Sequence, residues 1–369
     1  MDWQSFIRPH VHPMVPYAPG LRGSEVRERT GAAEVLKLSS NESSYGPFPR
    51  AAEAGRAVIE HLNRYPDGSA RDLKSALSEQ LGVATEELVV GNGSNEILIR
   101  LAQAVAGPGD EIVYGWPSFI VYRIACQLTG ATGVEVPLDE NDRYDLDGIL
   151  AAITYRTKVI YLCNPNNPTG TVYERDAFAA FMDAVPDNVL VVIDEAYFEF
   201  VTDESYPNGF DWYDGVRPVV VLRTFSKAYS LAGARVGYGA MPRPMVEALD
   251  KIREPFNVNT VAQAMAYYSL GDSTELARRV GENAAQRGRL IDALRAVGVR
   301  VADSQTNFVW AHLPNAAGVF EALLAEGVIV RSFGPTPALR FGVGTQRETD
   351  RMVEVIEKLA GRGLFAGWR

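Results

Sequence analysis

The stretch that decides the fold is Thr224-Phe225-Ser226-Lys227-Ala228-Tyr229-Ser230, which follows the apolar run Val219-Val220-Val221-Leu222. Gly233-Ala234-Arg235-Val236-Gly237 comes next and adds an arginine. The pKa of a lysine falls readily on desolvation or beside another cation, and its neutral amine is a nucleophile. The pattern therefore indicates a lysine that forms a Schiff base with an aldehyde cofactor, while Ser226 and Arg235 hold a phosphate. For Lys227 alone, a solvated loop lysine is the alternative.

A second segment supplies a carboxylate. The run Val189-Leu190-Val191-Val192-Ile193 is continuous and apolar, as in a strand buried on both faces of a parallel sheet, and Asp194 follows it. Ligands of open α/β sheets bind at the carboxyl ends of the strands. A carboxylate there can keep a pyridine nitrogen protonated, which makes the ring an electron sink. Tyr197 can donate its phenol to a ring oxygen; a helix N-cap is the alternative reading of Asp194.

A third segment joins a buried strand to a rigid turn. Val159-Ile160-Tyr161-Leu162-Cys163 runs into Asn164-Pro165-Asn166-Asn167-Pro168-Thr169-Gly170. The prolines fix φ and the glycine permits a sharp bend. The side-chain amide of Asn167 can bond the same ring oxygen as Tyr197. Without the aspartate and the lysine, this segment would be read as an ordinary loop.

Composition and charge narrow the class of protein. The 369 residues are 47% hydrophobic and 22% charged, with a net charge of −10 and no basic patch, which argues against nucleic acid as a partner. Cys126 and Cys163 lie far apart without metal spacing, so we expect both to be reduced and buried. An isolated His10-x-His12 predicts no metal site. No apolar run approaches the roughly 20 residues of a membrane span, and no signal pattern begins the chain. We expect a cytoplasmic enzyme without a membrane partner.

The length predicts two domains, and the composition of the first residues predicts an arm. Residues 1–45 are rich in proline and aromatics without regular periodicity, so we expect an arm that packs across the active site or a partner subunit. Residues 46–255 form a large domain and residues 256–369 a smaller one, linked by a long helix over 273–297. The smaller domain is expected to be α+β, with strands near 299–301, 308–311, 328–331 and 339–341 and helices near 316–326 and 348–359.

The large domain has the alternation of an α/β fold. Strands are expected at 87–90, 111–114, 159–162, 189–193 and 219–222, and helices at 73–81, 96–105 and 244–253. This order predicts a mostly parallel sheet between helices. Gly91-Asn92-Gly93-Ser94-Asn95 lies between a strand and a helix, where free N–H groups and the helix dipole attract an anion. A nucleotide-binding oxidoreductase is the alternative from another class, but the glycines fit neither of its usual phosphate motifs.

Three motifs in order carry a resemblance: Asn-Pro-x-Asn-Pro-Thr-Gly, Asp-x-Ala-Tyr, and Ser-Lys followed by Gly-x-Arg-x-Gly. Together they resemble fold-type I aminotransferases dependent on pyridoxal 5′-phosphate (PLP), class II, and more narrowly the histidinol-phosphate aminotransferase family. The resemblance covers nearly the whole chain and includes the stretches 38–43, 63–66, 91–96 and 339–344. It implies a cytoplasmic homodimer that belongs to histidine biosynthesis, an amino-acid biosynthesis pathway.

The resemblance implies a role for each matching residue. Lys227 would form the Schiff base with PLP and then move the substrate's proton. Asp194 would bond the pyridine nitrogen, Asn167 and Tyr197 the ring oxygen, and Phe119 would stack on the ring. The cofactor phosphate would be held by Gly93, Ser94, Asn95, Thr224, Ser226 and Arg235, and by Tyr65 of the neighbouring subunit. Substrate recognition would fall to Arg340, Arg331, Tyr17 and Asn41.

Departures from the family pattern leave the substrate open. The usual Asn-Glu-Asn-Pro is here Asn41-Glu42-Ser43-Ser44, and the stacking residue is Phe119 and not tyrosine. The resemblance favours transfer of an amino group between histidinol phosphate and 2-oxoglutarate in two ping-pong halves. An aromatic amino acid aminotransferase with the same PLP residues is the nearest rival. A PLP-dependent decarboxylase on the same scaffold is a third possibility.

Overall fold

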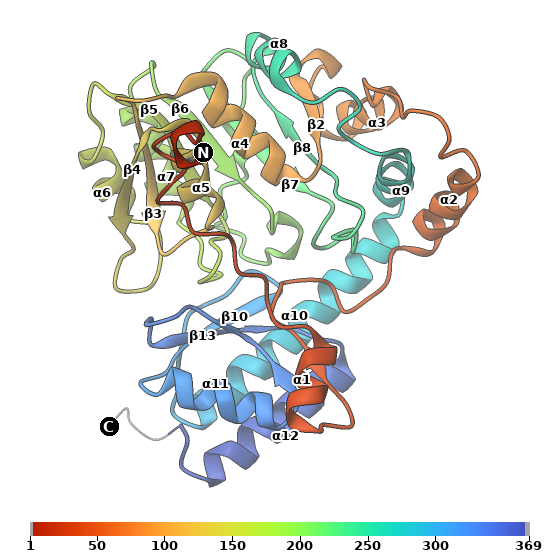
Figure 1. The fold of residues 1–369 in the computed structure, drawn as a ribbon, viewed down its shortest axis with the longest axis vertical. Coiled ribbons are helices and arrows are strands. Elements are labelled where there is room, and N and C mark those ends of the chain that lie inside the picture. Colours follow the sequence, from red (N-terminus) through yellow and green to blue (C-terminus); the bar gives the residue numbers. More distant parts are fainter. Residues whose placement is uncertain (1–2, 366–369) are drawn as a thin grey trace.

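A computed structural model describes residues 3–365. Residues 1–2 of the expected arm and 366–369 of the expected small domain lie outside the described residues. The chain forms a larger lobe around one sheet and a smaller lobe around another, and helix α10 (Ser273–Ala296) runs between them (Figure 1).

The large lobe is built on a seven-stranded sheet in the order β2-β8-β7-β6-β5-β3-β4. Six of these strands run in one direction, and β8, which pairs antiparallel with both β2 and β7, runs in the other. The strands are β2 (Leu88–Gly91), β3 (Glu111–Trp116), β4 (Thr132–Pro137), β5 (Thr157–Cys163), β6 (Leu190–Asp194), β7 (Val219–Thr224) and β8 (Gly237–Ala240). Residues 159–163, 190–194 and 219–224, which contain the predicted apolar runs, are buried throughout, because helices cover both faces. The predicted mostly parallel sheet is confirmed.

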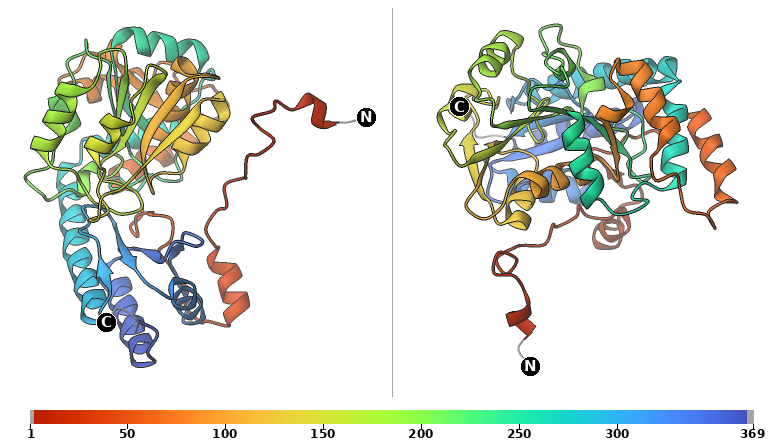
Figure 2. Two further views of the ribbon diagram at one scale, coloured as in Figure 1. Left: turned by 90° about the vertical axis from the view of Figure 1, so that its left-hand side faces the viewer. Right: turned by 90° about the horizontal axis from the view of Figure 1, so that it is seen from above.

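The helices of the large lobe lie on both faces of this sheet (Figures 1 and 2). They are α2 (Pro49–Ile59), α3 (Arg71–Leu81), α4 (Ser94–Val105), α5 (Val121–Thr129), α6 (Leu146–Ala151), α7 (Arg175–Ala184), α8 (Arg243–Ile252) and α9 (Thr260–Leu270). Helix α3 ends at Gly82, whose φ of 67° is left-handed, as its glycine predicted. Helix α4 begins at Ser94, two residues before the expected start, so its first turn directly follows the glycine turn.

The small lobe packs helices on an antiparallel sheet. Its strand order is β12-β13-β10-β9, with β9 (Arg300–Val301), β10 (Phe308–His312), β12 (Arg331–Ser332) and β13 (Ala338–Gly342). Helices α10, α11 (Ala316–Ala325) and α12 (Gln346–Gly361) enclose an apolar core that includes Leu290, Val309 and Ile356. The expected α+β organisation is what the structure has.

The N-terminal segment departs from the expectation of an arm without regular structure. Helix α1 (Gly23–Thr30) packs on the small lobe, and β1 (Leu36–Lys37) pairs in parallel with β11 (Val328–Ile329). Helix α1 buries only Val26, and β1 has two residues, so neither leaves a periodic pattern in the sequence. Much of the segment before α1 extends away from the body (Figure 2), with Trp3 and Phe6 exposed. Near its end, Tyr17 and Ala18 contact Arg331 of the small lobe.

Residues 256–270 also differ from the expected assignment to the small domain. Helix α9 packs against α2 and α3, and Val258 and Ala262 share an apolar cluster with Phe48 and Leu73. The sequence does not reveal which lobe an apolar helix face will meet. By packing, the large lobe therefore extends to α9, and α10 makes the connection.

Among the helices of residues 3–365, none combines the length and the apolar character that a bilayer crossing requires.

Candidate active site

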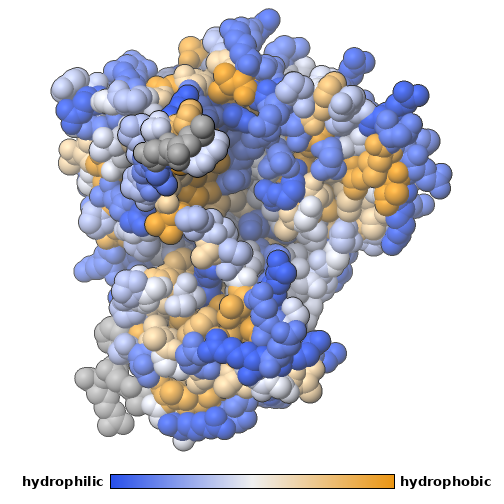
Figure 3. Space-filling view, in the orientation of Figure 1, coloured by the Kyte–Doolittle hydropathy of each residue, from blue (hydrophilic) through white to orange (hydrophobic). Residues whose placement is uncertain are grey.

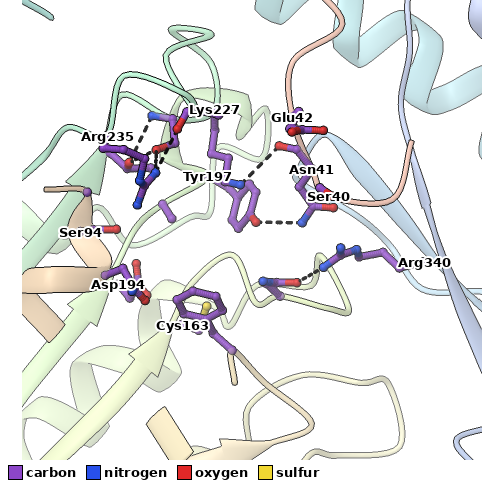
Figure 4. A pocket seen from close by; sticks show the side chains of 18 of the residues that line it. Ser40, Asn41, Glu42, Ser94, Cys163, Asp194, Tyr197, Lys227, Arg235 and Arg340 are labelled. Carbon is purple, nitrogen blue, oxygen red and sulfur yellow. Dashed lines mark hydrogen bonds between the residues drawn. The ribbon is translucent and has the colours of Figure 1, made fainter. Parts of the chain in front are cut away.

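A cavity of about 300 Å³ opens at the carboxyl ends of β5, β6 and β7, where the small lobe meets the large one. Its walls contain every residue predicted for the site except Tyr65 and Arg331: Tyr17, Asn41, Gly93, Ser94, Asn95, Phe119, Asn167, Asp194, Tyr197, Thr224, Ser226, Lys227, Arg235 and Arg340. Figure 4 shows that these side chains come from elements distant in sequence and from both lobes. Ser40, Glu42, Cys163, Ala196 and Ala232 also line the cavity and were not predicted.

Lys227 follows β7 and places its amine in the cavity. Its Nζ lies 3.4 Å from the carbonyl oxygen of Asn41 and 5.6 Å from the ring centre of Tyr197. Burial lowers the pKa of Lys227 to about 8, and the positive charges of Arg340 and Arg235 act in the same direction. A pKa of about 8 leaves roughly a tenth of the amine neutral at pH 7, far more than for an ordinary lysine, and the neutral amine is the form that a nucleophile or a general base requires.

Asp194 ends β6 with its carboxylate buried in the cavity wall. Its Oδ2 accepts a hydrogen bond of 2.9 Å from the hydroxyl of Tyr122, and its Oδ1 has no partner among the described residues. Burial raises the pKa of Asp194 to about 6, against the hydrogen bond from Tyr122, which lowers it. A buried acceptor oxygen without a donor is costly, so this oxygen is suited to a protonated nitrogen of a ligand.

Tyr122 was missed by the sequence analysis. It lies on α5, three residues after Phe119, and its ring stacks on Tyr161 at 4.7 Å while meeting Phe119 edge-on at 5.9 Å. The signal was weak because an aromatic residue on an apolar helix face normally indicates core packing. Tyr122 does pack in the core, and its hydroxyl also restrains the carboxylate of Asp194.

The start of α4 forms an anion cradle. Gly93, with φ of 80°, precedes the helix, and a Cβ on it would lie 2.5 Å from Nη2 of Arg235. A Cβ on Gly237 would lie 2.4 Å from the backbone nitrogen of Ser94, so both positions need glycine for this close approach. The helix dipole and the free N–H groups of the first turn favour an anion here.

Two hydroxyls and a guanidinium complete the cradle. The Thr224 and Ser226 hydroxyl oxygens lie 3.0 Å apart, and Nη1 of Arg235 lies 3.5 Å from the Ser226 hydroxyl. Arg235 itself has a left-handed φ of 64°, which a non-glycine residue adopts rarely and at a cost. This set of donors has the chemistry of a phosphate site.

The far side of the cavity carries hydrogen bonds between the lobes. Asn41 donates from Nδ2 to the hydroxyl of Tyr197 at 2.9 Å, and Arg340 on β13 donates to the side-chain oxygen of Asn167 and, at 2.7 Å, to the carbonyl of Ser39. Burial lowers the pKa of Arg340 to about 10 and raises the pKa of Tyr197. Nε of Arg340 is buried without a partner in the described chain.

Two predicted residues lie elsewhere. Arg331 on β12 is the cross-strand neighbour of Arg340, but its guanidinium donates to the carbonyl of Ala18 at 3.1 Å and lies 5.8 Å from the ring centre of Tyr17. In this arrangement Arg331 holds the segment that carries Tyr17. Tyr65 is 81% exposed and stacks on Phe256 at 4.6 Å, away from the cavity of its own chain.

The unpaired polar atoms of the cavity indicate the kind of ligand it takes. Asn41 Oδ1, Asn95 Oδ1, Asp194 Oδ1 and Arg340 Nε are all buried without partners in the described chain. The cavity thus presents an anion cradle at one end, an acceptor for a protonated nitrogen beyond it, and an amine above the space between them (Figure 4). A flat heteroaromatic aldehyde that carries a phosphate matches these groups. Among the described residues, no three His, Cys, Asp or Glu side chains gather as metal ligands would.

Comparison with known proteins identifies the family. Residues 33–356 match the family model of aminotransferase class I and II, so the chain belongs to this family. A histidinol-phosphate aminotransferase of Anaeromyxobacter sp. (strain Fw109-5) is 42% identical over 96% of this chain and 99% of its own length. An aromatic amino acid aminotransferase of Streptomyces avermitilis is 45% identical over 95% of this chain and 97% of its own.

Solved structures resemble the fold closely. The crystal structure of histidinol-phosphate aminotransferase from Sinorhizobium meliloti in complex with pyridoxal-5′-phosphate superposes with a TM-score of 0.87 at 28% identity. The match covers 96% of this chain and 98% of that one. The predicted fold type and family are thereby confirmed.

The contact between Tyr122 and Asp194 predicts a change in the pH dependence of stability. The pKa of Asp194 is raised from 3.8 in the unfolded chain to about 6 in the folded protein. Its contribution to the free energy of unfolding is therefore most favourable below about pH 4 and is lost as the pH rises through 6. Tyr122→Phe removes a donor to the charged form, so this loss should extend about one pH unit higher. Chemical denaturation of the cofactor-free protein between pH 4 and 8 measures it.

Tyr161→Phe is the matched control, since its hydroxyl donates to the carbonyl of Leu98 at 2.8 Å and does not contact Asp194. Both variants lose one buried hydroxyl contact, but only Tyr122→Phe should move the pH window. Identical pH profiles for the two variants would contradict the assignment.

Proposed function

We propose that this chain is a PLP-dependent aminotransferase that exchanges an amino group between histidinol phosphate and 2-oxoglutarate. The observation that carries the proposal is one cavity in which the amine of Lys227, the free oxygen of Asp194 and the anion cradle at α4 meet. Family membership and relatives named histidinol-phosphate aminotransferase at about 40% identity support it.

The residues that would hold the cofactor follow from their chemistry. The phosphate would lie on the first turn of α4, bonded by Gly93, Ser94, Asn95, Thr224, Ser226 and Arg235. Asp194 would accept from the pyridine nitrogen, and the Phe119 ring, which contacts Tyr122 edge-on, would cover one face of the cofactor. Asn167 and Tyr197 would bond the ring oxygen. When bound, PLP supplies an electron sink that stabilises negative charge at the substrate's α carbon.

The protein's own groups would then move the proton and orient the substrate. The amine of Lys227, with its pKa near 8, would carry a proton to and from the substrate carbon next to the nitrogen. Arg340 has an unpaired Nε and a planar fork suited to a carboxylate or a phosphate. Nη1 of Arg340 now donates to the side-chain oxygen of Asn167. To bind either anion through Nη1, Arg340 would break this hydrogen bond, and Asn167 would then be free to bond the cofactor.

Lys227→Ala tests the cofactor linkage. The parent with PLP should absorb at roughly 410–430 nm, and borohydride reduction followed by peptide mapping should find a pyridoxyl label at Lys227. The variant should lose the band and the label, and transamination should fall by at least about 10²-fold because the proton carrier is gone. A label at another lysine, or none in the parent, would refute the proposed chemistry.

The substrate is tested by direct competition. With glutamate as amino donor, we expect kcat/KM to favour imidazole-acetol phosphate over phenylpyruvate by about tenfold or more, because a phosphate adds charge-assisted hydrogen bonds to arginine. Arg331→Gln should erode this preference, if Arg331 leaves Ala18 to meet the phosphate. The aromatic amino acid aminotransferases at 44–45% identity make the reverse preference the specific alternative. A preference for phenylpyruvate would establish that activity instead.

We also propose a homodimer whose partner supplies Tyr65 to the site. Tyr65 and Phe256 are exposed and stacked together, and Ile59, Leu62 and Tyr267 are exposed on the same part of the large lobe. Apolar side chains gather over α2 on the face seen in Figure 3. Exposed aromatic pairs and apolar patches of this kind are typical of protein interfaces. The extended residues before α1 offer a further apolar surface to a second copy.

Complementation between two variants tests the shared site. Tyr65→Ala and Lys227→Ala should each be weakly active, while a mixture allowed to exchange subunits should regain about a quarter of the parent's activity, because half the dimers then hold one intact site. Sedimentation should give about twice the chain mass of 40.4 kDa for every sample. A mixture no more active than the average of its components would exclude a Tyr65 shared in this way.

A further inference from the structure

A buried ion pair lies directly behind the proposed cofactor site. Glu195 follows Asp194 at the end of β6, and Arg223 is the residue before Thr224 on β7. Nε of Arg223 donates to Oε2 of Glu195 at 2.9 Å, and Nη2 of Arg223 lies 2.8 Å from the same oxygen. The Glu195 side chain is completely buried and that of Arg223 is 7% exposed. Neither residue lines the cavity.

The pair connects the two strands that carry the central groups of the site. Side chains alternate between the faces of a strand, so Asp194 and Thr224 face the cavity while their chain neighbours Glu195 and Arg223 face the opposite way. The backbone N–H of Glu195 also donates to the carbonyl of Leu222 at 2.8 Å. The spacing between Asp194 and the segment that begins Thr224-Phe225-Ser226-Lys227 is therefore set on the side of the sheet away from the ligand.

The same pair holds the loop that carries Tyr197. The guanidinium of Arg223 lies 3.4 Å from the ring centre of Phe198 and 4.7 Å from that of Phe210, and Nη2 donates to the side chain of Asn208 at 2.9 Å. Oε1 of Glu195 accepts from the backbone N–H of Gly209 at 2.7 Å. The start and the middle of the loop thus both pack against the ion pair.

The network also reaches the loop of Asn167. The hydroxyl of Tyr206 lies 2.9 Å from Oε1 of Glu195 and 2.6 Å from the carbonyl oxygen of Asn164, so its hydrogen is shared between the two acceptors. Asn164 begins the turn that contains Asn167. The loop after β6 and the end of β7 therefore meet at one buried pair, which Tyr206 connects to the start of the loop after β5.

Energetics favours a positioning role over a purely stabilising one. Removing two charges from water costs several kcal/mol per ion, so a buried ion pair contributes little net stability compared with apolar side chains of similar size. What such a pair does supply is geometry, because a carboxylate with bonds to both oxygens and a guanidinium with a fixed plane allow few arrangements. The network around Glu195 satisfies both of its oxygens.

We propose that Glu195 and Arg223 are positioning residues that set the relative placement of Asp194, Tyr197 and Lys227 for the cofactor. The proposal rests on the proposed PLP chemistry, since these three residues matter together only if they hold one ligand. Neither residue lines the cavity, so loss of the pair should weaken and distort cofactor binding through the residues that it positions.

Glu195→Gln is the test variant, because its amide NH₂ would replace an oxygen that now accepts from Arg223 or Gly209. Glu111→Gln is the matched control. Glu111 is also buried and accepts from Nε of Arg156 at 2.9 Å and from the Thr154 hydroxyl at 2.5 Å, but it lies at the amino end of β3, opposite the cavity. Far-UV circular dichroism and thermal unfolding of the cofactor-free proteins report the general loss of stability, which should be similar in the two variants.

Three cofactor readouts separate positioning from stability: the dissociation constant of PLP, the pH midpoint at which the absorbance band of bound PLP titrates, and kcat. At a temperature where both variants are folded, Glu195→Gln should raise the dissociation constant about tenfold or more and displace the midpoint by about half a pH unit or more, with kcat reduced. Glu111→Gln should leave all three at the parent's values.

The outcomes are distinct. If Glu195→Gln matches Glu111→Gln in all three readouts, the positioning role is refuted. If Glu195→Gln does not fold, Arg223→Lys, which keeps the charge and loses the planar fork, is judged by the same criteria. If the parent itself binds no PLP at Lys227, the proposed function fails. That outcome differs from one in which parent and variant bind PLP equally well, which refutes only the positioning role.

Discussion

The parallel alignment of β5, β6 and β7 is the constraint on which the rest of the structure depends. Parallel strands end at the same edge of a sheet, so the three loops that follow them converge although their cavity-lining residues are spread from Asn167 to Arg235. The strands can be parallel and central only because helices bury both of their faces. Their polar end residues are thereby left in a sheltered place where electrostatic interactions are strong.

Polar atoms at these strand ends lack hydrogen-bond partners on the cavity side, whereas a hydrogen-bonded ion pair holds the strands together on the opposite side. Toward the cavity, Asp194 Oδ1 and Arg340 Nε have no partner in the described chain. Burial disfavours the charged forms there: it raises the pKa of Asp194 and lowers the pKa values of Lys227 and Arg340. Behind the cavity, both carboxylate oxygens of Glu195 accept hydrogen bonds, and Nε and Nη2 of Arg223 both have acceptors. The fold thus accepts an energetic cost where a ligand can relieve it, and it fixes the geometry where no ligand reaches.

Residues on the central strands were predictable because local pattern and global environment agree there. A continuous apolar run that ends in a polar residue predicts a buried strand with a functional end, and Asp194, Asn167 and Lys227 all follow such runs. Tyr122 was missed because a hydroxyl on an apolar helix face has no distinguishing pattern. Helix α1 was missed because it is polar and buries only Val26. Arg331 matched a motif, but side-chain direction in this structure depends on the segment near Ala18 that packs against it.

By itself the sequence determined the alternation of strands and helices, the order of the motifs and the chemical types of the groups in the site, because these depend on periodicity and on residue identity along the chain. Only the tertiary structure decided which groups meet: Tyr122 with Asp194, Glu195 with Arg223, and Arg340 with Asn167 across the two lobes. It also decided that α9 belongs with the large lobe and that Tyr65 stacks on Phe256 and does not line the cavity of its own chain. These contacts join residues distant in sequence, and their partners are selected by the packing of whole faces, which no local pattern encodes.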